Sequence, residues 1–366
     1  MPSSAWRPYC RPFSDIFQKK RSDGKIPPLT RGRILRITFL LAVIFFLVGL
    51  AALVTGAGEV RLFAILGHLF SMGTGVEKGP WLDATQATIL FSIRLPRIVF
   101  AAIVGASLSL SGVIFQAILR NPLADPYILG ISGGAALGAV LAIILGAAAI
   151  PFGVPGLAFL GALLAIFAVY TLSGAKNDRS GNTLLLTGVI VNAFFAALLM
   201  FLLSVSSSDR LQSALFWLMG DLGLAQGREI LLAGLVMTGG FLVMLSQARA
   251  LNVLSLGEET ALQLGVDTKR TQGGLLLSAS LVTATAVSIS GTIGFIGLII
   301  PHLLRLLVGA DHRLLLPASA LFGATFLVAA DTAARTIMAP VELPVGVVTA
   351  LCGAPYFLYL LHRRAV

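Results

Sequence analysis

Charge is scarce in this chain of 366 residues: Asp, Glu, Lys and Arg make up 11% of it, while apolar and aromatic residues make up 57%. A soluble protein with this balance would expose too much apolar surface, so the composition predicts an all-α polytopic membrane protein. The formal net charge of +10 does not indicate a nucleic-acid partner, because nine of the 26 basic residues lie in the first 36 positions. That cluster is typical of a cytoplasmic tail next to anionic membrane lipid.

Cysteine and recognisable catalytic motifs are also lacking. The two cysteines, Cys10 in the basic tail and Cys352 in an apolar segment, give no basis for a disulfide or a metal site. The sequence has no G-x-x-x-x-G-K-[ST] phosphate loop, no H-E-x-x-H motif and no nucleophile–base pair placed by a motif. We therefore expect a chain that is not an enzyme, with no catalytic residue, no metal and no cofactor of its own. Something else must supply its energy.

No apolar segment has a charged residue at its centre. Proton-coupled transporters bind the coupling proton at membrane depth, so this absence disfavours a stand-alone secondary transporter, although backbone carbonyls could bind sodium instead. A membrane-embedded enzyme would need several polar groups at one depth, and we find none. The segments are rich in Gly, Ala and Ser, as close helix packing in lipid requires.

Ten segments have about the length needed to cross a bilayer as helices. They are Ile37–Val54, Ile98–Leu119, Ile128–Leu145, Leu157–Leu172, Leu184–Leu203, Ile230–Leu245, Gly273–Ser290, Ile293–Leu307, Leu314–Ala330 and Val345–Leu361. The first could be the apolar part of a signal peptide, but the long basic tail before it favours an uncleaved span. We expect residues 1–33 to be a disordered cytoplasmic tail and residues 34–366 to form one ten-helix domain.

The distribution of basic residues sets the predicted orientation. An even number of spans places both termini on one side, and with that side inside, 19 Lys and Arg are cytoplasmic and 7 are external. The positive-inside rule therefore favours cytoplasmic termini. The external segment after the first span should carry a short helix at 60–72. The external basic residues are Arg61, Lys78, Arg94, Arg97, Arg210, Arg228 and Arg335.

The longest charged interruption between spans is Gln247–Arg270, which we call the polar island. Ser255 could cap a short helix that has Glu258 and Glu259 in its first turn and that ends at Gly265. Such a helix often lies on the membrane surface as a simple connecting loop. The helix also carries apolar residues between its polar ones: Leu256, Ala261, Leu262 and Leu264.

The island resembles the E-A-A-x-x-x-G docking loop of ABC importer permeases, in the order Glu259-Thr260-Ala261 and then Gly265. From Ile93 onward, about three quarters of the chain is similar to the FecCD-type permeases for iron chelates and cobalamin. The matching stretches are Arg94-Leu-Pro-Arg97, Gly105-Ala-Ser-Leu-Ser-Leu-Ser-Gly112, Gln116, Asn121-Pro-Leu-Ala-Asp-Pro126, Leu129-Gly-Ile-Ser-Gly-Gly134, Leu256-Gly-Glu-Glu, Ala261, Leu264-Gly265, Gly291, Gly294-Phe-Ile-Gly-Leu-Ile-Ile-Pro-His302, Arg305, Asp311-His-Arg313, Glu342-Leu-Pro344 and Gly346.

The resemblance implies the architecture of a type II ABC importer permease with ten helices. It implies two ATP-binding cassette subunits that use ATP and Mg on the cytoplasmic face of a bacterial inner membrane. It also implies a periplasmic or lipid-anchored substrate-binding protein outside and a second permease copy, most simply a homodimer. The cargo would be a ferric siderophore, haem or cobalamin, and another metal complex or an oxyanion such as molybdate remains an alternative.

The resemblance also implies roles for particular residues. The ATPase would contact Gly257, Glu258, Glu259, Ala261 and Gly265 of the island. Arg94, Arg97 and Arg335 would meet acidic residues of the binding protein, because the planar guanidinium fork suits carboxylates. A plainer interpretation of these arginines is lipid anchoring, with Asp331 and Arg335 forming an i, i+4 pair. Ser180, Gly181 and Asn182 would lie near the inner gate.

Overall fold

The computed structural model describes residues 29–56, 83–174, 181–223 and 225–365, and all their regular structure is helical. The predictions for the basic tail up to residue 28 and for a short helix at 60–72 lie outside these residues. The long helices are α2 (Arg31–Val54), α5 (Leu95–Ile118), α6 (Ile131–Ile144), α7 (Gly153–Gly174), α8 (Gly181–Ser204), α10 (Gly227–Ser246), α13 (Thr268–Ser290), α14 (Ile296–Val308), α15 (His312–Thr336) and α16 (Val345–Ala365). Shorter elements are α4 (Ala84–Thr88), η2 (Ile89–Arg94), η3 (Pro126–Leu129), η4 (Ala147–Ala149), α9 (Ser208–Leu218), α11 (Ala248–Leu254) and α12 (Glu258–Gln263).

Each of the ten predicted spans overlaps one long helix, and the predicted bounds extend beyond the helix by one to four residues at α5, α6 and α14. Seven helices are long and apolar enough to cross a membrane, and α6, α14 and α16 are shorter apolar helices. The all-α polytopic fold expected from composition and hydropathy is therefore confirmed.

The second span begins well before the predicted boundary at Ile98. Its helix starts at Ala84, behind a capping box in which Gln86 N donates to Asp83 Oδ1 at 2.6 Å and Asp83 N donates to Gln86 Oε1 at 3.3 Å. It then continues through η2 into α5 without a break. The predicted start was wrong because it placed the two arginines, Arg94 and Arg97, outside the span. Both bond to other helices, and the helix continues through them.

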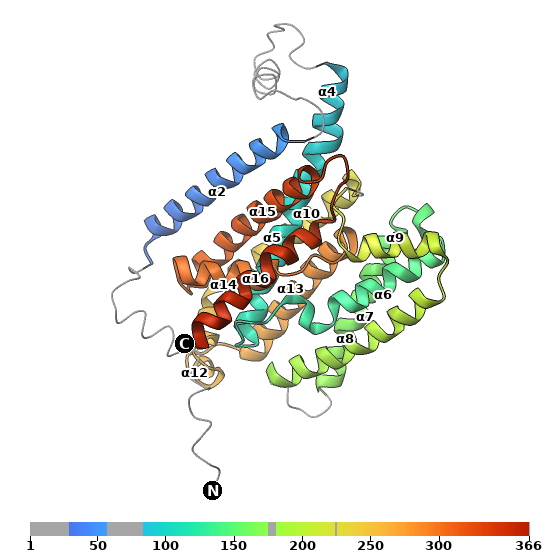
Figure 1. Ribbon diagram of the computed structural model, residues 1–366. Coiled ribbons are helices and arrows are strands. Elements are labelled where there is room, and N and C mark those ends of the chain that lie inside the picture. The colour runs from blue at the N-terminus through green and yellow to red at the C-terminus, as the bar shows by residue number, and fades with distance from the viewer. Residues whose placement is uncertain (1–28, 57–82, 175–180, 224, 366) are drawn as a thin grey trace.

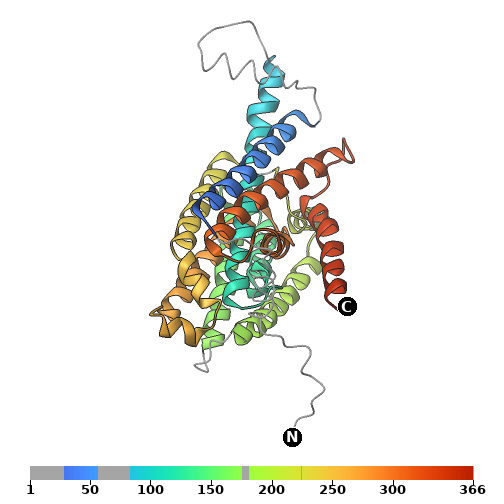
Figure 2. The same cartoon turned by 90° about the vertical axis from the view of Figure 1, so that its left-hand side faces the viewer.

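The helix α5 lies at the centre of the bundle and contacts α10, α13, α14 and α15 (Figures 1 and 2). Small residues bring the backbones together: a Cβ on Gly112 would lie 2.0 Å from Gly297 O of α14, and one on Gly323 would lie 2.5 Å from Gly105 O. No larger residue fits at these crossings, which accounts for the small residues seen in the sequence.

A buried polar bridge joins α5 to α14 next to these glycines. Gln116 Nε2 donates to the backbone oxygens of Gly297 and Leu298 at 3.2 and 3.1 Å, and Arg305 Nη1 donates to Gln116 Oε1 at 2.6 Å. One carboxamide thus satisfies two backbone carbonyls and receives a charged donor.

The bundle has two polar ends, which are opposite each other in Figure 1. The island end contains α11, α12, the first residues of α13 and α15 and the last residues of α14. The arginine end contains Arg97 of α5, the last turn of α15 and the segment 337–344. Arg33 in the first turn of α2 donates to Val308 O at 3.2 Å, so the start of α2 lies at the island end, as the alternation of spans requires. Which end faces the cytoplasm stays a prediction.

Candidate functional site

The polar island folds as two short helices, α11 and α12. The predicted cap at Ser255 is wrong: Ser255 ends α11, and its Oγ donates backward to Leu251 O at 2.9 Å. Gly257 is the residue before α12, with a φ of 127° that side chains rarely adopt. The error arose because a serine hydroxyl can bond the preceding turn of a helix as readily as it can cap the next one.

The predicted end of the island helix at Gly265 is confirmed. Gly265 has a φ of 79°, its N–H donates to Leu262 O at 3.0 Å, and Val266 N donates to Ala261 O at 3.0 Å. This left-handed turn satisfies the last carbonyls of α12 and points the chain toward α13.

The surface of α12 combines acidic and apolar side chains. Glu258 and Glu259 are exposed in its first turn, whereas Ala261 is buried and anchors the helix. Thr268 Oγ1 of α13 donates to Glu258 Oε1 at 3.4 Å. Three large apolar side chains around α12 are more than half exposed: Leu256, Leu262 and Leu264. Exposed leucines beside carboxylates at a membrane protein's polar end are typical of a protein-docking surface.

A single amide side chain connects the island to α15. Asn252 Nδ2 donates to Asp311 Oδ1 at 2.9 Å, and Asn252 Oδ1 accepts the backbone N–H of His312 at 2.9 Å. The Nδ1 of His312 lies 2.7 Å from the same oxygen. The amide nitrogen of Asn252 thus bonds the N-cap residue of α15, and its amide oxygen bonds the first residue of that helix.

Asp311 is a charged group at neutral pH. Burial raises the pKa of its carboxyl, but hydrogen bonds from Arg313 and Asn252 outweigh burial and lower the pKa to about 2. Asp311 also caps α15 through the backbone N–H of Arg313 at 3.0 Å.

At the arginine end, two of the three predicted docking arginines meet on one carboxylate. Arg97 Nη2 and Arg335 Nε each lie 3.0 Å from Asp331, whose side chain is only 1% exposed. The predicted pair of Asp331 and Arg335 is therefore present. Arg97 Nη1 also lies 2.8 Å from Oε2 of Glu342, which is 56% exposed. Two cations and two carboxylates balance in this cluster.

Arg94, the third predicted docking residue, bonds to a different helix. Its side chain is buried, and Nη1 donates to Leu53 O at 2.7 Å and to Val54 O at 3.3 Å. These carbonyls end α2, so the guanidinium caps the C-terminus of α2. A docking role for Arg94 stays a prediction, and it would require the side chain to leave these carbonyls.

The predicted inner-gate residues are only partly described. Gly181 and Asn182 are the first residues of α8, and Ser180 lies outside the described residues. Residues 175–180, which precede α8, all lie outside the described part of the chain, and the gate assignment stays a prediction.

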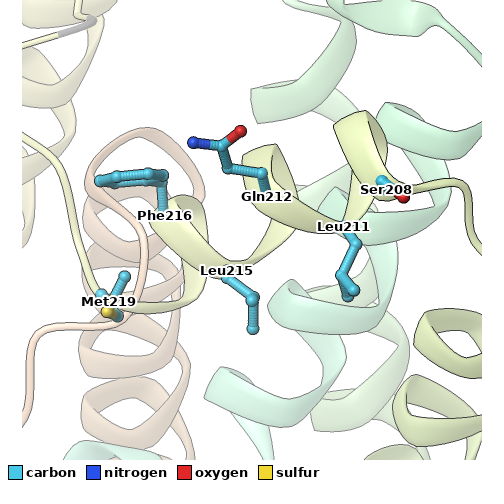
Figure 3. Close-up of a pocket in the computed structure, with 6 residues that line it drawn as sticks. All are labelled: Ser208, Leu211, Gln212, Leu215, Phe216 and Met219. Atoms are coloured by element: carbon cyan, nitrogen blue, oxygen red, sulfur yellow. The ribbon is translucent and has the colours of Figure 1, made fainter.

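A shallow hollow lies along α9. In Figure 3, Gln212 and Phe216 extend to one side of the helix, while Leu211 and Leu215 extend to the other. All of its lining residues come from α9 and the residue after it: Ser208, Leu211, Gln212, Leu215, Phe216 and Met219. With walls from a single helix, the hollow has no geometry for enclosing a ligand.

Sequence reasoning missed several contacts that organise the two ends. Asp311, Glu342 and Gln116 stood in matching stretches without an assigned role, and Asn252 lay inside the island unnoticed. The partners are far apart in the chain, such as Arg97 and Asp331, which are 234 positions apart. No local pattern joins residues at such distances.

Comparisons with known proteins agree with this architecture. The FecCD transport family matches residues 41–363. The chain belongs to this family. It is 51% identical over 282 residues to a cobalamin import system permease protein of Halobacterium salinarum, covering 77% of this chain and 75% of the relative. It is 44% identical over 285 residues to a hemin transport system permease protein of Yersinia pestis, covering 75% and 84%.

A solved structure supports the same conclusion. An inward-facing metal-chelate type ABC transporter matches with a TM-score of 0.76 and 36% identity, over 90% of this chain and 99% of the other. This FecCD chain is therefore a multi-pass membrane permease of the ABC importer class, that is, a transport subunit.

Proposed function

We propose that this FecCD permease carries an iron chelate, such as a ferric siderophore or haem, or cobalamin, across the cytoplasmic membrane. The names of its relatives support this range of cargo, since they include permeases for cobalamin and for hemin. All of these are bulky complexes. The membrane spans of this chain have no charged residue at their centres, so a transport path lined by them lets such a cargo pass without binding it tightly.

The energy comes from two ATP-binding cassette subunits that hydrolyse ATP with Mg, and this chain binds no cofactor of its own. The observation that carries the proposal is the exposed surface of α12, where Glu258 and Glu259 adjoin exposed leucines at one end of the bundle. The ATPase binds this surface, with Gly257, Ala261 and Gly265 fixing the shape of the helix and its two turns. The island end, the tail and both termini then face the cytoplasm.

A second copy of the chain completes the importer as a homodimer, and the path lies between the two copies. When ATP binds, the two ATPases change the distance between the two islands. This displacement shifts the helices between outward-open and inward-open arrangements. Gly181 and Asn182 begin α8, and together with Ser180, which precedes them in the sequence, they form the inner gate on the cytoplasmic side.

A substrate-binding protein docks at the arginine end. Arg97 and Arg335 already have carboxylate partners, so an acidic residue of the binding protein reaches Arg97 by replacing Glu342, the exposed member of the cluster. Such an exchange of carboxylates favours orientation and association rate more than affinity. Arg94 contributes only where docking releases it from the end of α2.

The test of the docking surface is the double variant Glu259→Arg with Gly265→Asp. Charge reversal at the first turn of α12 and a side chain at a φ of 79° disrupt both the surface and its turn. We expect co-purification of the ATPase and uptake to be lost while the chain still inserts into the membrane.

The matched control is Asp209→Arg, which reverses an exposed charge on the short helix α9. It should leave ATPase co-purification unchanged. Normal uptake by the double variant would disprove the docking assignment. Accumulation of cargo on an ion gradient by the purified chain alone would instead establish a secondary transporter.

A further inference from the structure

The island is held to the bundle by two kinds of contact. Leu251 and Leu254 of α11 are buried, and such apolar contacts resist separation but tolerate sliding. Hydrogen bonds have a preferred direction and fix the position along a helix. In the described part of the chain, the hydrogen bonds recorded between the island and α15 all involve Asn252.

The groups that Asn252 contacts are those that begin α15. Asp311 is the N-cap residue of α15, and His312 is its first residue. A shift of α11 that keeps these bonds must carry the N-terminus of α15 with it. The carboxamide is well suited to this, because one side donates to a carboxylate and the other accepts a backbone N–H.

The opposite end of α15 holds the arginine cluster. The helix has 25 residues, and Asp331 in its second-last turn binds both Arg97 and Arg335. A displacement applied at His312 therefore reaches the carboxylate that organises the arginine end. No other helix in the described residues has a side-chain bond to the island at one end and a part of this cluster at the other.

We propose that Asn252 is a positioning residue that transmits movement of the island to α15, and through α15 to the arginine end. This inference rests on the proposed function, in which the ATPase moves the island by gripping α12. Asn252 itself belongs to α11 and acts on Asp311 and His312. Its loss uncouples ATP hydrolysis from transport and leaves the ATPase bound.

The experiment uses the complete importer in liposomes, with its ATPase and its binding protein. Uptake of the cargo and hydrolysis of ATP are measured on the same preparation. For Asn252→Ala we expect normal co-purification of the ATPase and basal hydrolysis within about twofold of the wild type, with about tenfold less cargo carried per ATP, a typical size for the loss of coupling between two sites.

The matched control is Arg313→Ala. Arg313 bonds the same carboxylate at 2.6 Å, but it does so from the same helix, so its loss breaks nothing between the island and α15. It should keep the wild-type number of cargo molecules per ATP. A similar loss of coupling in both variants would mean that the cap of α15 matters, and not its bond to the island, and would overturn the proposal.

A reciprocal exchange separates coupling from folding. Asn252→Asp alone places two carboxylates where a hydrogen bond of 2.9 Å stood, and coupling should be lost. Adding Asp311→Asn restores a donor–acceptor pair, and Asn is as good an N-cap as Asp. We expect the exchanged pair to carry at least about half as much cargo per ATP as the wild type, because two residues in direct contact are not independent and the second change restores their hydrogen bond.

Three results would overturn the proposal: an unchanged ratio for Asn252→Ala, no recovery by the exchanged pair, or loss of ATPase binding in Asn252→Ala. The last would place Asn252 in the docking surface itself. Failure of the proposed function is a different result, because it is seen when Glu259→Arg with Gly265→Asp still retains the ATPase.

Discussion

The two ends of α15 are held in different ways. At the arginine end, Asp331 is 1% exposed and accepts two guanidinium groups from two helices. At the island end, Asp311 is 28% exposed, pairs with Arg313 of its own helix, and meets the island through one neutral amide. A buried ion pair tolerates little displacement because separation leaves a charge unpaired, whereas a partly exposed hydrogen bond can be exchanged with water. The arginine end of α15 is thus joined to α5 by a buried ion pair, and its island end is joined to α11 by the hydrogen bonds of one amide.

Of the substitutions that test this difference between the two ends of α15, the loss of Asp331 should have the largest effect on stability. In Asp331→Ala, Arg97 and Arg335 remain beside each other with only Glu342 to balance them. Removal of one partner from a buried ion pair costs about 3–5 kcal/mol. We expect a clear drop in the thermal unfolding midpoint of the detergent-solubilised chain. An unchanged midpoint would show that the cluster is not needed for stability.

A smaller effect is expected when Asp311 is titrated. Its folded pKa of about 2 lies below the ordinary value of 3.8, so its contribution to stability is complete above pH 3.8 and is lost as the pH falls toward 2. Asp311→Asn should remove this part of the acid dependence. Unfolding midpoints of both proteins across that pH range provide the check, and parallel curves would contradict the assignment.

The smallest effect is expected for Glu342→Gln. Its side chain is 56% exposed and Asp331 still holds Arg97, so stability should change by less than about 1 kcal/mol. Association with the binding protein should become faster, because Arg97 loses its exposed competitor. Stopped-flow binding at two salt concentrations measures this rate, and a slower association would mean that Glu342 itself belongs to the docking surface.

The sequence was sufficient for the spans but not for their partners. Hydropathy and length located all ten apolar segments, since a bilayer sets how many apolar residues a helix needs. The predicted start of the second span was wrong, because the helix runs from Ala84 through Arg94 and Arg97. An arginine is compatible with a span once another helix supplies backbone carbonyls, as for Arg94, or a carboxylate, as for Arg97.

The candidate site was predictable only as far as local chemistry extends. Gly265 marked a real helix end because positive φ strongly favours glycine. The predicted helix cap at Ser255 was wrong because its hydroxyl can bond either the preceding helix or the following one, and it bonds the preceding one. Asn252 gave no signal, since its partners are about 60 positions away and one of them is a backbone N–H.

The glycine crossings of α5 have a consequence for how a path can open. Where Gly105 faces Gly323 and Gly112 faces Gly297, bare main chains are in contact, and no side chain there can fold away to absorb strain. We therefore expect the three helices α5, α14 and α15 to move together as one block. We expect a passage to form along the outer boundary of that block and not through it.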